Sequence, residues 1–226
     1  MNCLWCDEEI MLEVSWTSLV NPTKPKQICE SCEKGLVELK GSRCERCSRV
    51  SSSTICEDCQ WWENYHHGKD VIDFNYSVFS YNHFIQEIIA KWKYRGDYEL
   101  GFVFREAFAD HFHEKFGNMT DVVAVPIPLS KDRLEERCFN QATMLASFLP
   151  VPTVEVLSRV HGEKQSKKKR RERISSKNPF ILSQKLNKAV LLVDDIYTTG
   201  TTLRHAASVL KEAGCPKVYT YTLIRG

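Results

Sequence analysis

Residues 190–202, which read VLLVDDIYTTGTT, constrain the fold more than any other segment of the chain. Four apolar residues are followed by two adjacent acids and then by hydroxylated residues around a glycine. The apolar run is typical of a buried strand, and the small residues are typical of a turn that opens a helix. The pattern predicts a phosphate-binding loop at the carboxyl edge of an open α/β sheet.

The residues after this strand suit the two halves of a sugar phosphate. Asp194 and Asp195 can accept hydrogen bonds from vicinal ribose hydroxyls, directly or through Mg²⁺. Backbone N–H groups and hydroxyls at a helix N-terminus stabilise a phosphate dianion, and a glycine permits close approach. The candidate phosphate ligands are Thr198, Thr199, Gly200, Thr201 and Thr202. The alternative interpretation is a solvated turn with a threonine cap.

A second candidate segment follows the motif VPIP at residues 125–128, which ends another apolar run. Arg137, Asn140 and Gln141 offer a guanidinium and two amides to phosphate oxygens or to the anomeric side of the ribose. A capped and salt-bridged helix start explains them without a ligand. Lys93 and Arg95 are further phosphate candidates, although an exposed helix end explains them equally well.

Strand and helix patterns alternate from Asn75 to the C-terminus. Phe104, Phe108 and Phe112 form one stripe of an expected helix. We expect strands near residues 75–81, 121–125, 153–157, 190–193 and 217–224, and helices near 84–95, 99–116, 140–148 and 201–213. The alternation predicts an α/β fold with a mainly parallel sheet and flanking helices.

Eight of the ten cysteines form four C-x-x-C pairs within the first 59 residues. In a reducing compartment this spacing indicates metal rather than a disulfide scaffold, and four thiolates favour structural zinc. The pairs are Cys3/Cys6, Cys29/Cys32, Cys44/Cys47 and Cys56/Cys59. We expect one or two zinc ions, with pairs combined in sequence order or crosswise.

The N-terminal segment lacks the periodicity of the rest of the chain, so we expect metal to hold it together. The expected division is a zinc-ribbon module at residues 1–69 and an α/β domain at residues 70–226. The module is acidic, with eight Lys/Arg against eleven Asp/Glu, while the remainder has 23 against 18. Its tryptophans either form a docking surface for a partner or pack around the knuckles, which are the metal-binding turns formed by the C-x-x-C pairs. They are Trp5, Trp16, Trp61 and Trp62.

A basic run separates two parts of the expected domain and has no core pattern. Its bases include Lys167, Lys168, Lys169, Arg170, Arg171 and Arg173. Such a run is typical of a solvated loop, which can neutralise pyrophosphate or follow a nucleic-acid backbone. It contains no aromatic residues of its own, whereas Tyr197 or Phe180 could stack a base. An inert charged loop is the alternative.

Several motifs together resemble the ComF family over nearly the whole chain. They are the four cysteine pairs, residues 93–96 (KYRG), 125–128 (VPIP), 137–141 (RCFNQ) and 165–173, Asn178, Phe180, and residues 194–202. Members usually have Gly after the arginine of the third motif, where this sequence has Cys138. The resemblance implies a type I phosphoribosyltransferase fold and a site for phosphoribosyl pyrophosphate with Mg²⁺.

The resemblance also implies handling of single-stranded DNA during natural transformation, together with the helicase-like ATPase ComFA. The chain shows no secretory signal and no apolar run long enough to span a bilayer. We therefore expect a cytoplasmic protein without membrane insertion, held at the inner face of the membrane only through partners.

Three functions fit these features. The first is a DNA-uptake accessory protein that binds phosphoribosyl pyrophosphate, or a related ribose phosphate, without turnover. The second is an active phosphoribosyltransferase, and the third is an assembly adaptor whose zinc module docks a partner beside a vestigial ligand site. The sequence has no motif for recognising an acceptor base, which favours the first.

Overall fold

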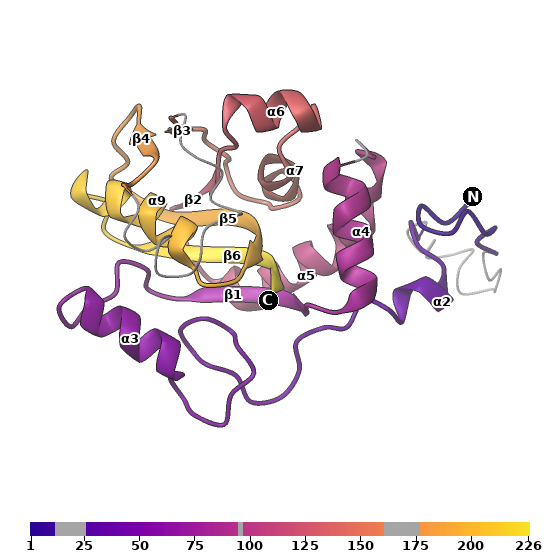
Figure 1. The fold of residues 1–226 in the computed structure, drawn as a ribbon, viewed down its shortest axis with the longest axis horizontal. Coiled ribbons are helices and arrows are strands. Elements are labelled where there is room, and N and C mark those ends of the chain that lie inside the picture. The colour runs from indigo at the N-terminus through magenta and orange to yellow at the C-terminus, as the bar shows by residue number, and fades with distance from the viewer. Residues whose placement is uncertain (12–25, 95–96, 161–176) are drawn as a thin grey trace.

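A computed structural model describes residues 1–11, 26–94, 97–160 and 177–226. Its centre is a four-stranded sheet with the order β1-β6-β5-β2, in which every neighbouring pair is parallel (Figure 1). The strands are β1 (Asn75–Ser80), β2 (Val122–Pro126), β5 (Ala189–Tyr197) and β6 (Val218–Arg225). The carboxyl ends of β2 and β5 therefore open at the same edge, as the sequence predicts.

The two faces of the sheet support two separate cores. Leu191 and Val193 of β5 point into one core, whereas Val190 and Leu192 point into the other. Helices α4 (His83–Tyr94), α5 (Arg105–Phe116) and α7 (Gln141–Ser147) contribute to the first core. Helix α9 (Thr201–Glu212) covers the second. Burial on both faces explains why β5 begins as a continuous apolar run.

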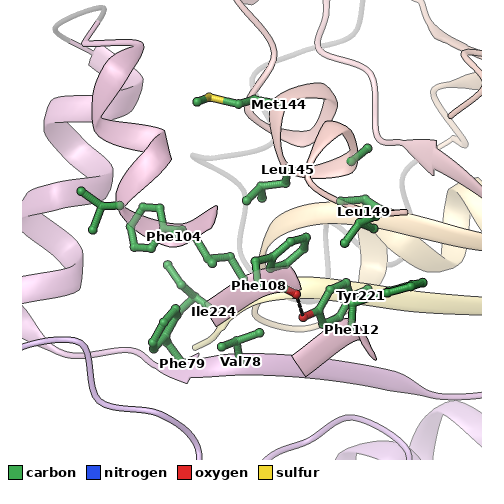
Figure 2. Close-up of a cluster of buried hydrophobic side chains, with 14 of the residues drawn as sticks. Val78, Phe79, Phe104, Phe108, Phe112, Met144, Leu145, Leu149, Tyr221 and Ile224 are labelled. Atoms are coloured by element: carbon green, nitrogen blue, oxygen red, sulfur yellow. Dashed lines mark hydrogen bonds between the residues drawn. The ribbon is translucent and has the colours of Figure 1, made fainter. Parts of the chain in front are cut away.

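The phenylalanine stripe packs against β6 in the first core (Figure 2). The ring of Phe108 stacks on Tyr221 with centroids 4.1 Å apart, and the Tyr221 hydroxyl donates to the Phe108 carbonyl over 2.6 Å. The expected single helix is divided, however, into a 3-10 helix, η1 (Glu99–Phe104), and α5. The tighter turn presses Gly101 against Met144 and Trp92, where a side chain would not fit.

The expected strand at residues 153–157 is also wrong in its bounds. Thr153 makes only an isolated bridge to Ala124, and strand β3 is Leu157–Arg159. It pairs antiparallel with β4 (Phe180–Leu182), and the two strands flank residues 161–176, which lie outside the described part. Helix α6 (Lys131–Arg137) connects β2 to α7.

The N-terminal segment packs along the sheet as well as carrying its own helices, α2 (Glu30–Glu33) and α3 (Glu57–Tyr65). Leu39 N–H donates to the carbonyl of Val78, and Ser80 N–H donates to that of Val37, so the segment runs beside β1 (Figure 1). Its second half joins the core under α9. None of the helices in the described ranges is long and apolar enough to cross a bilayer.

Buried polar side chains mark where this segment meets the sheet. Asn75 and Ser77 of β1 bond to one another and to Thr220 and Thr222 of β6. The Ser48 hydroxyl donates to the Asn75 carbonyl over 2.9 Å, and the Asn75 amide donates to the Cys47 carbonyl over 3.3 Å. The polar positions of these strands are thus satisfied by the cysteine-containing segment.

Candidate functional site

The loop between β5 and α9 is a tight turn centred on Gly200. Gly200 caps α9 with a φ of +72°, and a Cβ there would overlap the Arg204 guanidinium and the Tyr197 hydroxyl. The hydroxyls of Thr199 and Thr201 lie 2.9 Å apart. The turn therefore requires glycine both for its backbone conformation and for space.

A cavity of about 280 Å³ opens beside this loop at the carboxyl edge of the sheet. Of the ligand residues predicted from the sequence, its lining contains Arg137, Asn140, Gln141, Asp194, Asp195, Thr198 and Thr202. Segments that are distant in the chain thus meet at one site. Thr199, Gly200 and Thr201 lie outside the lining, and Thr201 is buried.

Arg137 and Gln141 form a buried pair in the cavity wall. The Arg137 Nη1 donates to the Gln141 Oε1 over 2.9 Å, and the two side chains are 7% and 2% exposed. The Gln141 Nε2 has no hydrogen-bond partner among the described residues. A buried amide without a partner is costly, and a ligand acceptor in the cavity would supply one.

Asn140 lines the same cavity, but its amide is already engaged. The side-chain oxygen caps α7 by accepting from Ala142 N–H over 3.0 Å, and the side-chain nitrogen donates to the Ile127 carbonyl over 3.0 Å. Asn140 therefore joins the turn after β2 to the start of α7. This geometry fits the capping interpretation of the residue.

The two acids of the loop differ in their surroundings. Asp195 forms an ion pair with Lys93 of α4, and both side chains are largely buried. Asp194 accepts from the Asp195 N–H over 2.9 Å. Burial, followed by the neighbouring Asp195 carboxylate, raises the pKa of Asp194 to about 7. One acid is thus paired with a cation, while the other titrates near neutral pH.

Cations surround the remainder of the cavity. Arg133 and Arg159 line it together with Lys93 and Arg137. Arg159, which ends β3 and flanks the basic run, was not predicted from the sequence. Burial, with Arg133 nearby, lowers the pKa of Arg159. A basic residue at a strand end beside a basic run was the sequence pattern that could have identified it.

The residues of the basic run, Lys164 to Arg173, lie outside the described residues. The aromatic residues expected to stack a base are described, and both are buried. Tyr197 is 2% exposed between the guanidinium groups of Arg204 and Arg225, and Phe180 is 5% exposed. Neither offers a free ring face, so that expectation is wrong.

The cysteine sulfurs gather into two groups in sequence order. Cys3, Cys6, Cys29 and Cys32 form the first cluster, and Cys44, Cys47, Cys56 and Cys59 form the second. Within each cluster the Sγ atoms lie within 4.8 Å of one another, and the Cys6–Cys29 and Cys47–Cys56 separations are 3.7 Å. A tetrahedral zinc ion about 2.3 Å from each sulfur sets neighbouring sulfurs about 3.8 Å apart. Both clusters therefore fit zinc.

The two clusters are built in the same way. In each first pair, the residue after the second cysteine, Asp7 or Ser48, has a φ near +60°. Its N–H donates to the carbonyl of the first cysteine over 2.9 Å. In each second pair, the first cysteine caps a helix, Cys29 for α2 and Cys56 for α3. The module is a repeated knuckle-and-helix unit.

The clusters differ in their burial and their neighbours. All four cysteines of the second cluster are buried, whereas Cys6 of the first is exposed. A hydrogen bond from Cys59, followed by the charge of Arg225, lowers the pKa of Cys47 to about 4 despite its burial. A cysteine held as thiolate suits metal binding.

Some tryptophans of the module are packed inside the protein and others are exposed, so neither the packing nor the docking expectation holds for all of them. Trp62 is 3% exposed, and its indole N–H donates to the Thr199 carbonyl in the phosphate loop over 3.0 Å. Trp61 is 42% exposed and stacks on Tyr65. Trp5 is half-buried against Phe84 of α4. Trp16 lies outside the described residues.

Comparisons with known proteins indicate the family. A family model described as the phosphoribosyl transferase domain matches residues 133–226. Competence protein ComFC of Bacillus subtilis (strain 168) is 39% identical and covers 99% of this chain and 94% of its own. Competence protein ComFC of Streptococcus pneumoniae (strain ATCC BAA-255 / R6) is 30% identical over the full length of both. A solved hypoxanthine phosphoribosyltransferase of Staphylococcus aureus is 18% identical, covers 62% of this chain and 64% of its own, and has a TM-score of 0.29.

The parallel sheet, the loop after β5 and the matched family model define the class. This is a protein of the type I phosphoribosyltransferase fold with an N-terminal module of two four-cysteine clusters. The chain belongs to the ComFC family of competence proteins. The predicted family and fold class are confirmed, and the family supports a role in competence.

Proposed function

We propose that this protein binds phosphoribosyl pyrophosphate, or a related ribose phosphate, with Mg²⁺ and without turnover. The observation that carries the proposal is the buried Gln141 Nε2, which has no partner among the described residues, in a cavity that also contains two acids and four cations. The acids suit ribose hydroxyls and Mg²⁺, and the cations suit phosphates. The cavity thus offers complementary charge to both parts of one ligand.

Binding in this cavity requires a change at Asp195. The free protein pairs Asp195 with Lys93, so a ligand must replace that cation with ribose hydroxyls or with Mg²⁺. Lys93 would then be available to a phosphate oxygen. The charges of Asp195 and Lys93 would thus each have an opposite charge or a polar partner both before and after the ligand binds.

The absence of turnover is supported by the burial of the two aromatic residues that we expected to stack a base. Tyr197 and Phe180 are buried, and the sequence carries no other recognised base-binding motif. An active transferase would release pyrophosphate in the presence of a base. Assaying pyrophosphate release with a panel of bases and amines separates the two functions.

Calorimetric titration with phosphoribosyl pyrophosphate and Mg²⁺ tests the ligand site. Asp195→Asn should remove binding, because it loses the carboxylate at the cavity. Asp121→Asn is the matched control, since Asp121 lies before β2 at the opposite edge of the sheet and is paired with Lys188. Absence of binding by the unaltered protein would reject the proposal.

We further propose that the basic run binds single-stranded DNA in DNA uptake, in cooperation with the helicase-like ATPase ComFA. Arg159 supports this, because it is a cation of the cavity wall at the end of β3 and the run follows it in the sequence. If a bound strand also contacts Arg159, titration of oligonucleotides with phosphoribosyl pyrophosphate present should show competition.

Salt dependence tests the contribution of the run. Replacing Lys167, Lys168, Lys169, Arg170 and Arg171 with Ala should flatten the dependence of log affinity on log salt. The slope should decrease by about 0.7 for each phosphate that the protein no longer neutralises. An unchanged slope would exclude the run from DNA binding.

An adaptor function makes a different prediction. If the module docks ComFA or another partner through its first cluster, Cys6→Ser should release the partner while ligand binding survives. Co-purification of the two full-length proteins measures this.

A further inference from the structure

The side chain of Arg225 lies between the second cysteine cluster and the phosphate loop. Arg225 ends β6 and is 6% exposed. Its Nε donates to the Cys47 carbonyl over 2.9 Å, and its Nη2 lies 3.7 Å from the Cys47 Sγ. Its Nη1 donates to the carbonyls of Tyr197 and Thr198, each over 3.0 Å. One guanidinium thus binds the cluster and the start of the loop.

Trp62 provides a second connection between the same parts. Helix α3 begins after Cys56 and contains both Cys59 and Trp62. The Trp62 indole donates to the Thr199 carbonyl over 3.0 Å, and the Arg204 guanidinium lies 4.4 Å from the centre of the Trp62 ring. The position of the helix start therefore influences the position of Thr199.

These contacts orient three successive peptide groups. The carbonyls of Tyr197, Thr198 and Thr199 all point toward the cluster side. In a planar trans peptide, the N–H of the following residue points the opposite way. The N–H groups of Thr198, Thr199 and Gly200 therefore point away from the cluster, and of these three residues Thr198 lines the cavity.

The first cluster has different neighbours. Trp5, within its first knuckle, packs against Phe84 of α4 and lies under the Lys91 ammonium group. Cys3 joins the core on the face of the sheet opposite to the second cluster. The first cluster is therefore a natural comparison, with the same construction and a separate environment.

We propose that the second cysteine cluster, closed by zinc, positions the phosphate loop through Arg225 and Trp62. A single ion bound by Cys44, Cys47, Cys56 and Cys59 fixes the Cys47 carbonyl and the start of α3 relative to one another. Arg225 is hydrogen-bonded to the Cys47 carbonyl, and Trp62 is part of α3, so both side chains that contact the loop depend on these two elements. Opening this cluster lowers the affinity of the proposed ligand site, on which this inference rests, and opening the first cluster does not.

Two variants test the connection without touching a zinc ligand. Arg225→Gln should keep two zinc ions per chain but lower affinity for phosphoribosyl pyrophosphate with Mg²⁺ by about tenfold, the size of one charge-assisted hydrogen bond. Trp62→Phe should lower it by about threefold, because the indole donor to the Thr199 carbonyl is lost. Arg43→Gln is the control, since Arg43 contacts Tyr76 rather than the loop.

Amide hydrogen exchange gives a readout that needs no ligand. In Arg225→Gln and Trp62→Phe, exchange should become faster in peptides covering residues 197–203 and stay unchanged in α5. A merely structural loss would raise exchange throughout the domain. Zinc content and the midpoint of thermal unfolding are measured on the same samples.

Cysteine variants compare the two clusters directly. Cys56→Ser and Cys6→Ser should each lower zinc content by one ion, but only Cys56→Ser should speed exchange at residues 197–203 and weaken binding. Normal exchange and affinity in Arg225→Gln with both zinc ions retained would overturn the inference, even if the cysteine variants fail to fold. Faster exchange in Arg225→Gln, with no binding by the unaltered protein, would instead reject only the ligand proposal.

Discussion

Arg204 and Asp70 form a buried ion pair across 134 residues of sequence. The Arg204 Nη2 and Nε donate to the Asp70 carboxylate over 2.6 Å and 3.1 Å, and the side chains are 3% and 7% exposed. The same guanidinium donates to the Tyr197 hydroxyl over 2.8 Å. The pair thus ties the segment before β1 to the first turn of α9 and to the phosphate loop.

Asp70→Asn should destabilise the protein by about 3–5 kcal/mol, because it leaves the Arg204 charge buried without compensation. Urea unfolding followed by circular dichroism measures the loss. Glu33→Gln, which breaks the exposed Lys26–Glu33 pair, should cost less than about 1 kcal/mol. Equal losses in the two variants would contradict this account of burial.

Ligand affinity should rise with pH through neutrality. Because the folded pKa of Asp194 is raised to about 7, its carboxylate is mostly protonated at pH 6 and mostly ionised at pH 8. Contact with ribose hydroxyls or Mg²⁺ favours the ionised form, so affinity should increase by about tenfold between these pH values. The same raised pKa lowers the free energy of unfolding as pH increases from about 4 to 7.

Calorimetry at several pH values tests this dependence, with Asp194→Asn as the control. The ligand's own phosphates titrate equally in both proteins, so the difference between them reports Asp194. Identical pH profiles would show that Asp194 does not contact the ligand in its ionised form.

Replacing Cys138 with Gly should stabilise the protein by up to about 1 kcal/mol. Cys138 ends α6 with a φ of +64°, the left-handed conformation that favours glycine. Urea unfolding of Cys138→Gly, with Cys138→Ser as a variant that keeps the Cβ, checks the effect, and a loss of stability in Cys138→Gly would refute it.

Gly200→Ala should both destabilise the protein and weaken ligand binding by tenfold or more, about 1.4 kcal/mol in binding free energy. The added methyl group would collide with Arg204 and Tyr197. Gly214→Ala is the matched control, because Gly214 also has a positive φ but nothing lies near its Cβ position. That variant should lose stability only. Binding by Gly200→Ala that matches the unaltered protein would contradict the crowded geometry of the turn.

The sequence predicted the elements whose structure depends on residues close together in the chain. The apolar run before Asp194, the glycine turn and the C-x-x-C spacing each define a structure over a few residues. Arg159 was not predicted, and Lys93 was explained equally well by an exposed helix end, because the approach of both to the acids depends on how β3 and α4 pack. The contacts of Trp62 with Thr199 and of Arg225 with Cys47 span 137 and 178 residues, and no local pattern encodes them. Likewise, no local pattern marks the division of residues 99–116 into η1 and α5.

The polar patch of Asn75, Ser77, Thr220 and Thr222 has a practical consequence for dissecting this protein. A truncated chain that starts at Asp70 would lose Ser48 and Cys47 as partners for that patch, as well as the indole that covers Arg204. The C-terminal portion made alone would therefore expose polar and apolar groups that are buried in the intact protein. Experiments that assign activities to separate fragments would measure this damage, whereas single substitutions in the intact chain would not.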